Sequence, residues 1–414
     1  MPLARVRRLD FLGLIVQKFG GTSVANAERV MNVAKRVVET QRAGNSVVVV
    51  VSAQGDTTDD LIEKAKEINP KASKREMDML LSTGEQISIS LLAMAIQSLG
   101  IGAVSLTGWQ IGMQTDANYS AARIIKIDGE RIRKELDSNN IVIVAGFQGI
   151  DKYGDITTLG RGGSDTTAVA VAAALHADLC EIYTDVDGVY TADPRIVPEA
   201  KKLDDISFDE MLELASLGAN VLHNRSVEMA KKYNVKMSVR SSLNNNPGTY
   251  VKEESKVEKM IVRGVARDND VARIALLSVK DEPGMAFRIF SLLSKNRINV
   301  DIILQSIGRE GLKDISFTVS ESCLDKAAEI LEAEKDYLGY AEMQTSTEYS
   351  KVSIVGCGMV NNPGVASKMF EALYDANINI HMISTSEIKV SVLVNRKNAD
   401  AAVRVIHDGF NLAQ

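Results

Sequence analysis

The fold of this chain is decided by the stretch Leu14-Ile15-Val16-Gln17-Lys18-Phe19-Gly20-Gly21-Thr22-Ser23. An apolar run passes through Lys18 into a pair of glycines, which is the pattern of a buried strand followed by a tight turn. Glycine lets backbone N–H groups approach a phosphate closely, and a following helix N-terminus adds positive partial charge. The stretch therefore predicts an anion-binding turn with Lys18 as its cation. Taken alone, it is equally consistent with a surface lysine beside a turn.

A second glycine-rich turn, Thr158-Leu159-Gly160-Arg161-Gly162-Gly163-Ser164-Asp165-Thr166-Thr167, lies far along the chain. Its Arg161 can hold a carboxylate through two hydrogen bonds. Ser164 or Asp165 could simply cap the next helix, and capping is compatible with ligand contact. The turn is neither a Walker A loop, since the chain has no Gly-Lys pair, nor G-x-G-x-x-G, since position 165 is Asp. Two such turns favour phosphoryl transfer, which depends on positioning and charge neutralisation.

Up to about residue 250, apolar β-branched runs alternate with helical stretches, which predicts an α/β domain with a mainly parallel sheet. Turn residues 244–249 and a charged run at 252–259 then mark a domain boundary near residues 250–262. The expected strands are 47–51, 141–146 and 179–184, and the expected helices are 25–43, 77–99 and 165–175.

An internal repeat follows the boundary. Pro283-Gly284 begins a helical stretch that ends at Asn299, and Pro363-Gly364 begins another that ends at Asn379, 80 residues later (363 − 283). Each copy has a strand before the Pro-Gly pair and further strand after its helix. The repeat predicts two small α+β modules of one type.

Bulk composition excludes several classes of protein. A net charge of −6 over 414 residues gives no reason to expect nucleic acid or an anionic membrane as partner. Three scattered cysteines indicate neither a disulfide framework nor a zinc site, and they fit the cytoplasm. We expect no membrane-spanning run, and we interpret residues 1–13 as a frayed extension or a misassigned start.

Three other patterns could carry chemistry. Residues 183–195 could form a calcium-binding loop, but Val189 and Ile196 occupy positions where calcium ligands should be. A nucleotide-binding loop is therefore favoured, with an ordinary ordered surface loop as the alternative. Val355-Gly356-Cys357-Gly358 lacks the third glycine of a dinucleotide fingerprint. The chain has no G-x-S-x-G elbow for hydrolysis.

Taken together, these motifs resemble the aspartokinases of the amino acid kinase superfamily, and the two repeats resemble ACT domains. The match runs from about Leu14 to the C-terminus. The motifs that carry it are Lys18–Ser23, Val51-Ser52-Ala53, Arg75–Leu80, Thr83-Gly84-Glu85, Gly146-Phe147-Gln148-Gly149, Thr158–Thr167, Thr184–Tyr190 and Val239–Ser242.

The resemblance implies a three-layer αβα kinase domain at residues 14–250 and ACT regions at 263–345 and 346–414, with a strand near 261–267 that could belong to the second. It implies ATP-dependent phosphorylation of the L-aspartate side-chain carboxylate to 4-phospho-L-aspartate, with Mg²⁺ on the nucleotide. This is the first step toward lysine, threonine, methionine and isoleucine. No covalent enzyme intermediate is expected.

Site residues follow from the resemblance, motif by motif. Lys18 and Asp165 are the expected catalytic residues, with no metal ligand assigned. Substrate-binding residues would be Thr58, Glu85, Phe147, Arg161, Gly162, Gly163 and Ser164, with Arg161 on the α-carboxylate and Glu85 on the α-ammonium. ATP-binding residues would be Lys18, Phe19, Gly20, Gly21, Tyr183, Thr184, Asp185, Val189, Tyr190, Arg195 and Asn220.

One position departs from the family pattern. Family members often have a lysine near the nucleotide in G-A-K-V-L-H-P-R, whereas this chain has Asn220. Asn220 supplies no charge, although it could hydrogen-bond the nucleotide, or Lys201, Lys202 or Arg195 could compensate. This departure from the family pattern bears on the affinity of the protein for ATP.

The ACT pair implies feedback inhibition by lysine, threonine or both, and pairing of ACT units in a homodimer. The polar residues of the ACT pair could serve only as helix caps and turn residues, which would require no ligand. The asparagine that is duplicated at positions 299 and 379 favours a binding role instead. Expected effector contacts are Asp281, Asn299, Asp301, Gln305, Asn379, Ser386 and Glu387.

The sequence leaves two alternative functions open. One is a kinase for glutamate or N-acetylglutamate, against which the segment 161–165, Glu85 and the ACT pair argue. The other is a catalytically inactive amino-acid sensor, and the argument against it is the retention of Lys18, Glu85, Arg161 and Asp165.

Overall fold

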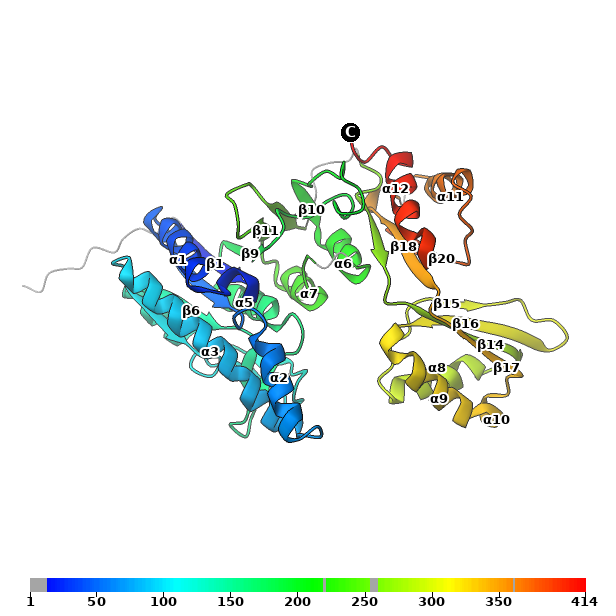
Figure 1. Cartoon of the computed structure of the whole chain (residues 1–414), viewed down its shortest axis with the longest axis horizontal. Helices are drawn as coiled ribbons and strands as arrows, with labels where there is room; N and C mark the ends of the chain where they lie inside the picture. Colours follow the sequence, from blue (N-terminus) through cyan, green and yellow to red (C-terminus); the bar gives the residue numbers. More distant parts are fainter. Residues whose placement is uncertain (1–12, 219–220, 254–259, 360–361) are drawn as a thin grey trace, which may run out of the picture. The chain divides into compact units, whose positions relative to one another are not determined.

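The computed structural model describes residues 13–218, 221–253, 260–359 and 362–414 (Figure 1). They form two compact units. Unit 1 comprises residues 13–189, 202–215 and 221–253, and unit 2 comprises 190–201, 216–218, 260–359 and 362–414.

The main sheet of unit 1 has the strand order β10-β12-β11-β9-β1-β2-β6-β3, and its neighbours run parallel except for β11 and β12. This confirms the predicted mainly parallel α/β fold. Parallel neighbours place their carboxyl ends at one edge, which is where such sheets bind ligands. The strands are β1 (Leu14–Phe19), β2 (Ser46–Val51), β3 (Ala103–Leu106), β6 (Ile141–Ala145), β9 (Leu179–Thr184), β10 (Asp205–Ser207), β11 (Met237–Ser241) and β12 (Thr249–Lys252).

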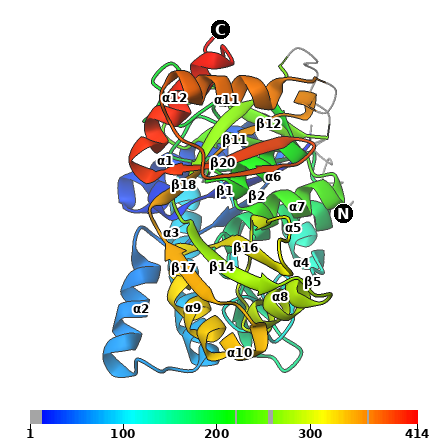
Figure 2. The ribbon, with the colours of Figure 1, turned by 90° about the vertical axis from the view of Figure 1, so that its right-hand side faces the viewer.

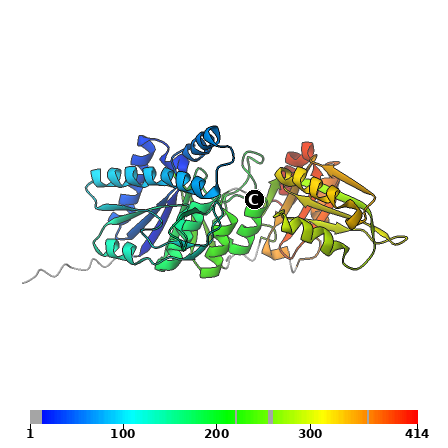
Figure 3. The same cartoon turned by 90° about the horizontal axis from the view of Figure 1, so that it is seen from below.

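Helices cover both faces of this sheet (Figure 3). One face packs against α1 and α3, which contact each other, while α5 and α7 pair on the other. The run Val47–Val51 is buried throughout, because a strand covered on both sides has no polar face. The helices are α1 (Ala27–Arg42), α2 (Thr57–Ile68), α3 (Lys74–Ser98), α4 (Glu130–Asp137), α5 (Gly163–Leu175), α6 (Phe208–Ser216) and α7 (Asn224–Tyr233).

A small second sheet of unit 1 has the order β5-β4-β7-β8. Its last strand ends at Thr158, so the second glycine-rich turn leaves directly from this sheet toward α5. The strands are β4 (Gln114–Thr115), β5 (Ile124–Lys126), β7 (Gln148–Ile150) and β8 (Ile156–Thr158).

Unit 2 contains the two repeated modules, each a four-stranded sheet with its helices packed on it (Figure 2). Gly284 and Gly364 have φ values of 93° and 94°, so the duplicated Pro-Gly turns share one backbone conformation. The first module is β14 (Ala272–Lys280), α8 (Met285–Lys295), β15 (Ile303–Gln305), β16 (Leu312–Val319), α9 (Leu324–Ala333), α10 (Lys335–Leu338) and β17 (Glu342–Ser346).

The second module is completed by a strand from before the first. It contains β18 (Tyr349–Val355), α11 (Val365–Asp375), β19 (Met382–Thr385), β20 (Lys389–Asn395) and α12 (Ala399–Gly409). Its edge strand β13 (Gly264–Asp268) pairs antiparallel with β18. The strand near 261–267 therefore lies in the sheet of the second module.

The sequence predicts one continuous kinase domain from 14 to 250, and the structure differs for residues 190–201. Ala192, Ile196 and Val197 are buried in the hydrophobic core of the second module. Thr191 Oγ1 lies 2.9 Å from Nε2 of the fully buried His407 on α12. The segment therefore packs with the second module rather than with the kinase sheet.

Helix α3 differs from the expectation that no run reaches membrane-spanning size. By length and composition alone it is long and apolar enough to cross a membrane. However, 56% of its most apolar window is buried inside the unit, as in the core helix of a globular domain.

Candidate active site

The predicted anion turn lies at the carboxyl edge of the central strands. Phe19, the last residue of β1, is paired with Val51 of β2 and Tyr183 of β9. Gly20 and Gly21 follow at once. A side chain on Gly21 would place its Cβ 2.5 Å from the Ala53 carbonyl oxygen, so only glycine permits this approach of the two backbones.

Lys18 is held by an ion pair at this edge. Its Nζ lies 2.7 Å from Oδ1 of Asp165, in the first turn of α5. The two side chains are 12% and 13% exposed, so the pair is largely shielded from water but still reachable. Both predicted catalytic residues, 147 positions apart (165 − 18), are thus brought together by the fold.

Glu85 approaches the same edge from α3. Its Oε1 accepts a hydrogen bond of 3.1 Å from the backbone N–H of Ala53, the residue whose carbonyl contacts Gly21. Among the described residues its Oε2 is buried with no hydrogen-bond partner. Burial raises the pKa of Glu85 to about 7, against a backbone hydrogen bond that acts the other way. An unpartnered carboxylate oxygen of this kind fits an ammonium group.

The raised pKa of Glu85 predicts a pH dependence of stability. The unfolded chain would protonate this group near pH 4.5 and the folded chain near 7, so folding favours the protonated form. The contribution of Glu85 to the free energy of unfolding is about 3 kcal/mol. It is fully present below pH 4.5 and is lost as the pH rises through 7. Urea unfolding of the ligand-free protein from pH 4.5 to 8 should show this loss, and Glu85→Gln should lack it. Glu63→Gln, on an exposed site of α2, is the control; a pH-independent difference between wild type and Glu85→Gln would contradict the prediction.

The second glycine-rich turn is sterically constrained around the start of α5. Gly162 has φ of 64°, and a Cβ there would lie 2.1 Å from Cγ of His223. A Cβ on Gly163 would lie 2.8 Å from Cδ2 of Phe147, and one on Gly146 would lie 2.6 Å from Oγ of Ser164. These contacts place Phe147 and Ser164, two of the predicted substrate-binding residues, beside the turn.

Arg161 is exposed at the tip of this turn. Within the described part of the chain its guanidinium has no hydrogen bond or ion pair. Its donors are therefore available to a carboxylate. Thr58 lies half-buried at the start of α2, next to Thr57, whose Cγ2 would be 3.6 Å from a Cβ on Gly84.

Asp78 anchors the strand that leads into the second turn. This fully buried carboxylate accepts hydrogen bonds from the backbone N–H groups of Ser120 and Thr158, both at 2.8 Å. It also accepts bonds from their hydroxyls at 3.0 and 2.9 Å. Arg225 of α7 holds the next residue by donating to the Leu159 carbonyl at 3.0 Å.

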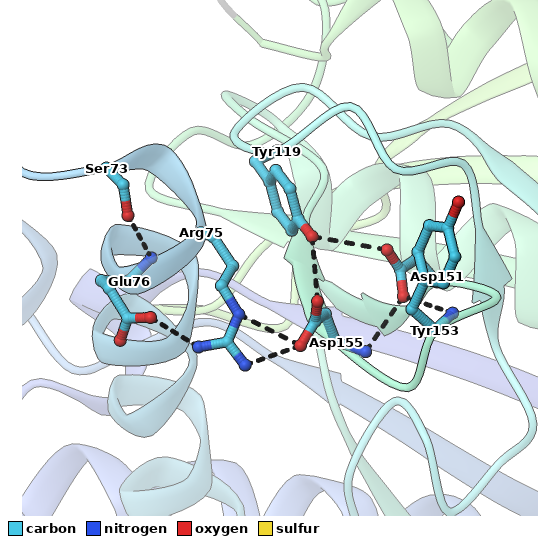
Figure 4. Close-up of polar contacts among 7 residues, drawn as sticks. All are labelled: Ser73, Arg75, Glu76, Tyr119, Asp151, Tyr153 and Asp155. Atoms are coloured by element: carbon cyan, nitrogen blue, oxygen red, sulfur yellow. Dashed lines mark hydrogen bonds and ion pairs between the residues drawn. The ribbon is translucent and has the colours of Figure 1, made fainter.

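A second polar network ties α3 to the β7–β8 hairpin (Figure 4). Arg75 donates to Oδ1 of Asp155 through Nε and Nη2, at 3.1 and 2.6 Å, and this hydrogen bonding holds the pKa of Asp155 below its usual range. Tyr119 donates to Asp155 at 3.1 Å, and Asp151 accepts from the Tyr153 and Asp155 N–H groups. The β7–β8 hairpin, whose second strand ends at Thr158, is therefore held by Arg75 of α3 and by Tyr119.

Several predicted ATP-binding residues have no accessible side chain at this edge. Phe19 and Tyr183 are core residues that stack with ring centroids 4.6 Å apart, and Val189 is 1% exposed. Only their backbone could face a nucleotide, because their side chains fill the interior of unit 1. Tyr190 and Arg195 lie in the segment assigned to unit 2.

The remaining nucleotide residues are placed differently. Thr184 is the last residue of β9, and its hydroxyl accepts a hydrogen bond from the Val186 N–H at 3.1 Å. Asp185, which follows it, is exposed. Asn220 lies outside the described residues.

Sequence reasoning missed the roles of Asp78 and Arg225. Asp78 is a charged residue on the buried face of an apolar-rich helix. Because a buried carboxylate needs hydrogen-bond donors, this position could have indicated a structural role. Nothing in the local sequence identifies its partners, because they lie 42 and 80 residues away.

Among the described residues, no group of three or more His, Cys, Asp or Glu side chains could hold a metal ion. A magnesium ion carried on nucleotide phosphates needs only one or two protein carboxylates. Asp165 fits that need, because it lies at the edge beside Lys18.

A Lys18–Asp165 pair between two glycine-rich turns, on a mainly parallel α/β sheet with two repeated α+β modules in the same chain, fits a phosphotransferase of the amino acid kinase class. Comparison with known families agrees: residues 13–241 match the amino acid kinase family, and residues 273–339 and 352–410 match ACT domains.

The chain belongs to the aspartokinase family. It is 53% identical over 403 residues to an aspartokinase of Bacillus sp. (strain MGA3), covering 97% of this chain and 98% of that protein. It is 51% identical over 407 residues to an aspartokinase of Corynebacterium glutamicum, covering 97% of each. It also resembles the crystal structure of Escherichia coli aspartokinase III in complex with aspartate and ADP, with a TM-score of 0.81, 26% identity and coverage of 96% and 99%.

Proposed function

We propose that this chain transfers the γ-phosphoryl group of ATP to the side-chain carboxylate of L-aspartate, giving 4-phospho-L-aspartate. The observation that carries the proposal is the shielded Lys18–Asp165 pair between the two glycine-rich turns. A carboxylate is already a nucleophile at neutral pH, so the obstacle is the repulsion between two anions. Lys18 lowers that repulsion, and backbone N–H groups of the turns orient the phosphate oxygens.

The substrate is held by its α-groups. Arg161 binds the α-carboxylate and Glu85 binds the α-ammonium, which matches an exposed cation with free donors and a buried carboxylate with a free oxygen. Ser164 and Thr58 complete the pocket near Phe147. An ammonium group at Glu85 keeps this carboxyl ionised in the complex despite its raised pKa.

The nucleotide lies over the loop that follows β9, at Thr184 and Asp185. Asp165, the carboxylate paired with Lys18, would hold a Mg²⁺ ion carried on the phosphates, and that ion would neutralise part of their charge. Lys18 is then the principal protein cation at the phosphates. Asn220, together with Tyr190 and Arg195, remains a proposed contact.

Regulation operates through the ACT modules. Ser386 and Glu387 line a cavity of about 330 Å³ beside the Gly364 turn. Asp281 pairs with Lys313 at 2.9 Å, and Asp301 pairs with Lys351 of the other module at 2.5 Å. An effector ammonium would therefore compete with lysines at Asp281 and Asp301. The remaining proposed contacts are Asn299, Gln305 and Asn379.

The protein is a cytoplasmic homodimer that associates through its ACT modules. Exposed apolar side chains of unit 2, which a partner could bury, support this assembly. They include Phe287, Ile307 and Tyr374.

A coupled hydroxamate assay tests the reaction. We expect product with aspartate and ATP, with a preference for aspartate over glutamate of about 10- to 200-fold, because one methylene must be rejected. Absence of hydroxamate with aspartate would refute the activity and favour an amino-acid sensor.

The same assay tests regulation. Millimolar lysine or threonine should lower the rate, and Glu387→Gln should weaken that response while the uninhibited rate is kept. Glu371→Gln, exposed on α11, is the matched control. If neither amino acid changes the rate of the wild-type enzyme, the regulatory role is wrong even if the activity stands.

A further inference from the structure

A second polar cavity opens in unit 1, between α1 and the loop after β11. Its volume is about 380 Å³, larger than a phosphate ion needs. The residues that line it are Ser23, Arg29, Asn32, Val33, Lys35, Arg36, Glu39, Ser242, Leu243, Asn244 and Asn245.

This cavity is separate from the site of Lys18. Phe19 packs into the core cluster that contains Val33 and Val37 of α1. Successive residues of a strand point to opposite faces, so Lys18 projects to the other face, where it meets Asp165 of α5. The cavity on the α1 face is therefore not part of the proposed catalytic site around Lys18, and any ligand that it binds is a separate one.

Its lining is strongly cationic. Arg29, Lys35 and Arg36 face a single carboxylate, Glu39. Among the described residues, the side chain of Lys35 has no hydrogen-bond or ion-pair partner, although Glu39 is only one helical turn away. Such an unbalanced set of charges favours an anion.

The arginines retain donors for a ligand. Arg29 donates to the Thr22 carbonyl and Arg36 donates through Nη2 to the Asn244 carbonyl at 2.7 Å. A guanidinium has five N–H donors, so these bonds leave several unused. The Ser23 and Ser242 hydroxyls, 2.9 Å apart, add further polar groups to the wall.

The wall of the cavity is held in place from behind. Asn244 donates to Oδ1 of Asp187 at 2.6 Å, and Asn246 donates to Oδ2 at 3.1 Å. Arg36 also lies 5.0 Å from the centre of the buried Tyr183 ring. Donors that are already positioned lose less freedom when an anion binds.

We propose that this cavity is a second anion site, which binds phosphate or the phosphate group of a small metabolite. Two arginine forks, a lysine and neighbouring hydroxyl and amide groups match a tetrahedral oxyanion. The spare volume suits a phosphate ester, and the ion and the ester share the same recognition chemistry.

The test is calorimetric titration of the full chain with inorganic phosphate and with ribose 5-phosphate at low ionic strength. Binding should persist in Lys18→Met, fall about tenfold or more in Arg29→Gln/Lys35→Gln, and tighten in Glu39→Gln, because each change alters one or two charges at the cavity. Tighter binding of ribose 5-phosphate than of phosphate would identify an ester as the ligand, and the reverse would identify the free ion.

The control variant is Lys64→Gln/Lys66→Gln, which removes two exposed charges from α2. It should bind as the wild type does. The proposal is overturned if neither probe binds, if Lys18→Met abolishes binding, or if Arg29→Gln/Lys35→Gln or Glu39→Gln leaves the affinity unchanged. Loss of phosphate binding in Lys18→Met would overturn only this second anion site, because the proposed kinase reaction of the wild-type protein does not depend on the cavity.

Discussion

Lys18→Met should lower kcat by about 100- to 1000-fold, since it removes the cation that the ion pair with Asp165 holds at the carboxyl edge between the two turns. Methionine keeps an apolar stem of similar length, so the packing beside Gly20 is preserved. The KM for aspartate should change much less, because the proposed aspartate contacts are Arg161 and Glu85. Steady-state kinetics with varied ATP and aspartate measure both quantities.

Two controls separate chemistry from folding in this prediction. Lys64→Met removes an exposed lysine from α2 and should leave kcat unchanged. Lys18→Met/Asp165→Asn also removes the carboxylate that the single variant leaves without its cation, and it should be as inactive as the single variant. A Lys18→Met enzyme that retains kcat within about threefold would show that Lys18 does not face the transferring phosphoryl group.

Asp78→Ala should lower the free energy of unfolding by about 3–5 kcal/mol. The carboxylate accepts four hydrogen bonds, and its loss leaves the N–H of the buried Thr158 without an acceptor. The KM for aspartate should rise as well, because Thr158 leads directly into Gly160 and Arg161. Urea unfolding and aspartate-dependent kinetics measure the two effects.

The matched control for Asp78 is Glu63→Ala, which removes a carboxylate from an exposed position on α2. It should change stability by less than about 0.5 kcal/mol. Asp78→Asn should recover part of the lost stability, since an amide keeps one acceptor oxygen. If Asp78→Ala unfolds like the wild-type protein, the four bonds are replaced by water and Asp78 is not an anchor.

The site could be predicted from the sequence where its signals are local. Glycine pairs after apolar β-branched runs indicate turns, whatever the rest of the chain does, because glycine alone tolerates such close backbone approach. Lys18, Gly20, Gly21 and Arg161 were predicted in this way, with their turns at strand ends, whereas the catalytic role of Asp165 was predicted only from the resemblance to aspartokinases.

Side-chain direction could not be predicted in the same way. Phe19 and Tyr183 stand within motifs that the sequence assigns to ATP, yet they stack in the core. Their burial depends on α1 and α3 covering that face of the sheet. A motif identifies a segment, whereas the packing of distant helices decides which of its side chains remain accessible.

The sequence by itself determined the alternation of strands and helices, the two glycine-rich turns and the duplicated Pro-Gly modules, because each depends on residues close together along the chain. Only the tertiary structure decided that residues 190–201 join the second module, that β13 completes its sheet and that Asp78 supports Thr158. Each of these depends on partners far apart in sequence: Thr191 and His407, for example, are separated by 216 residues. A hydrogen bond or buried surface between such partners leaves no periodic pattern in either segment, so it becomes visible only when the chain is folded.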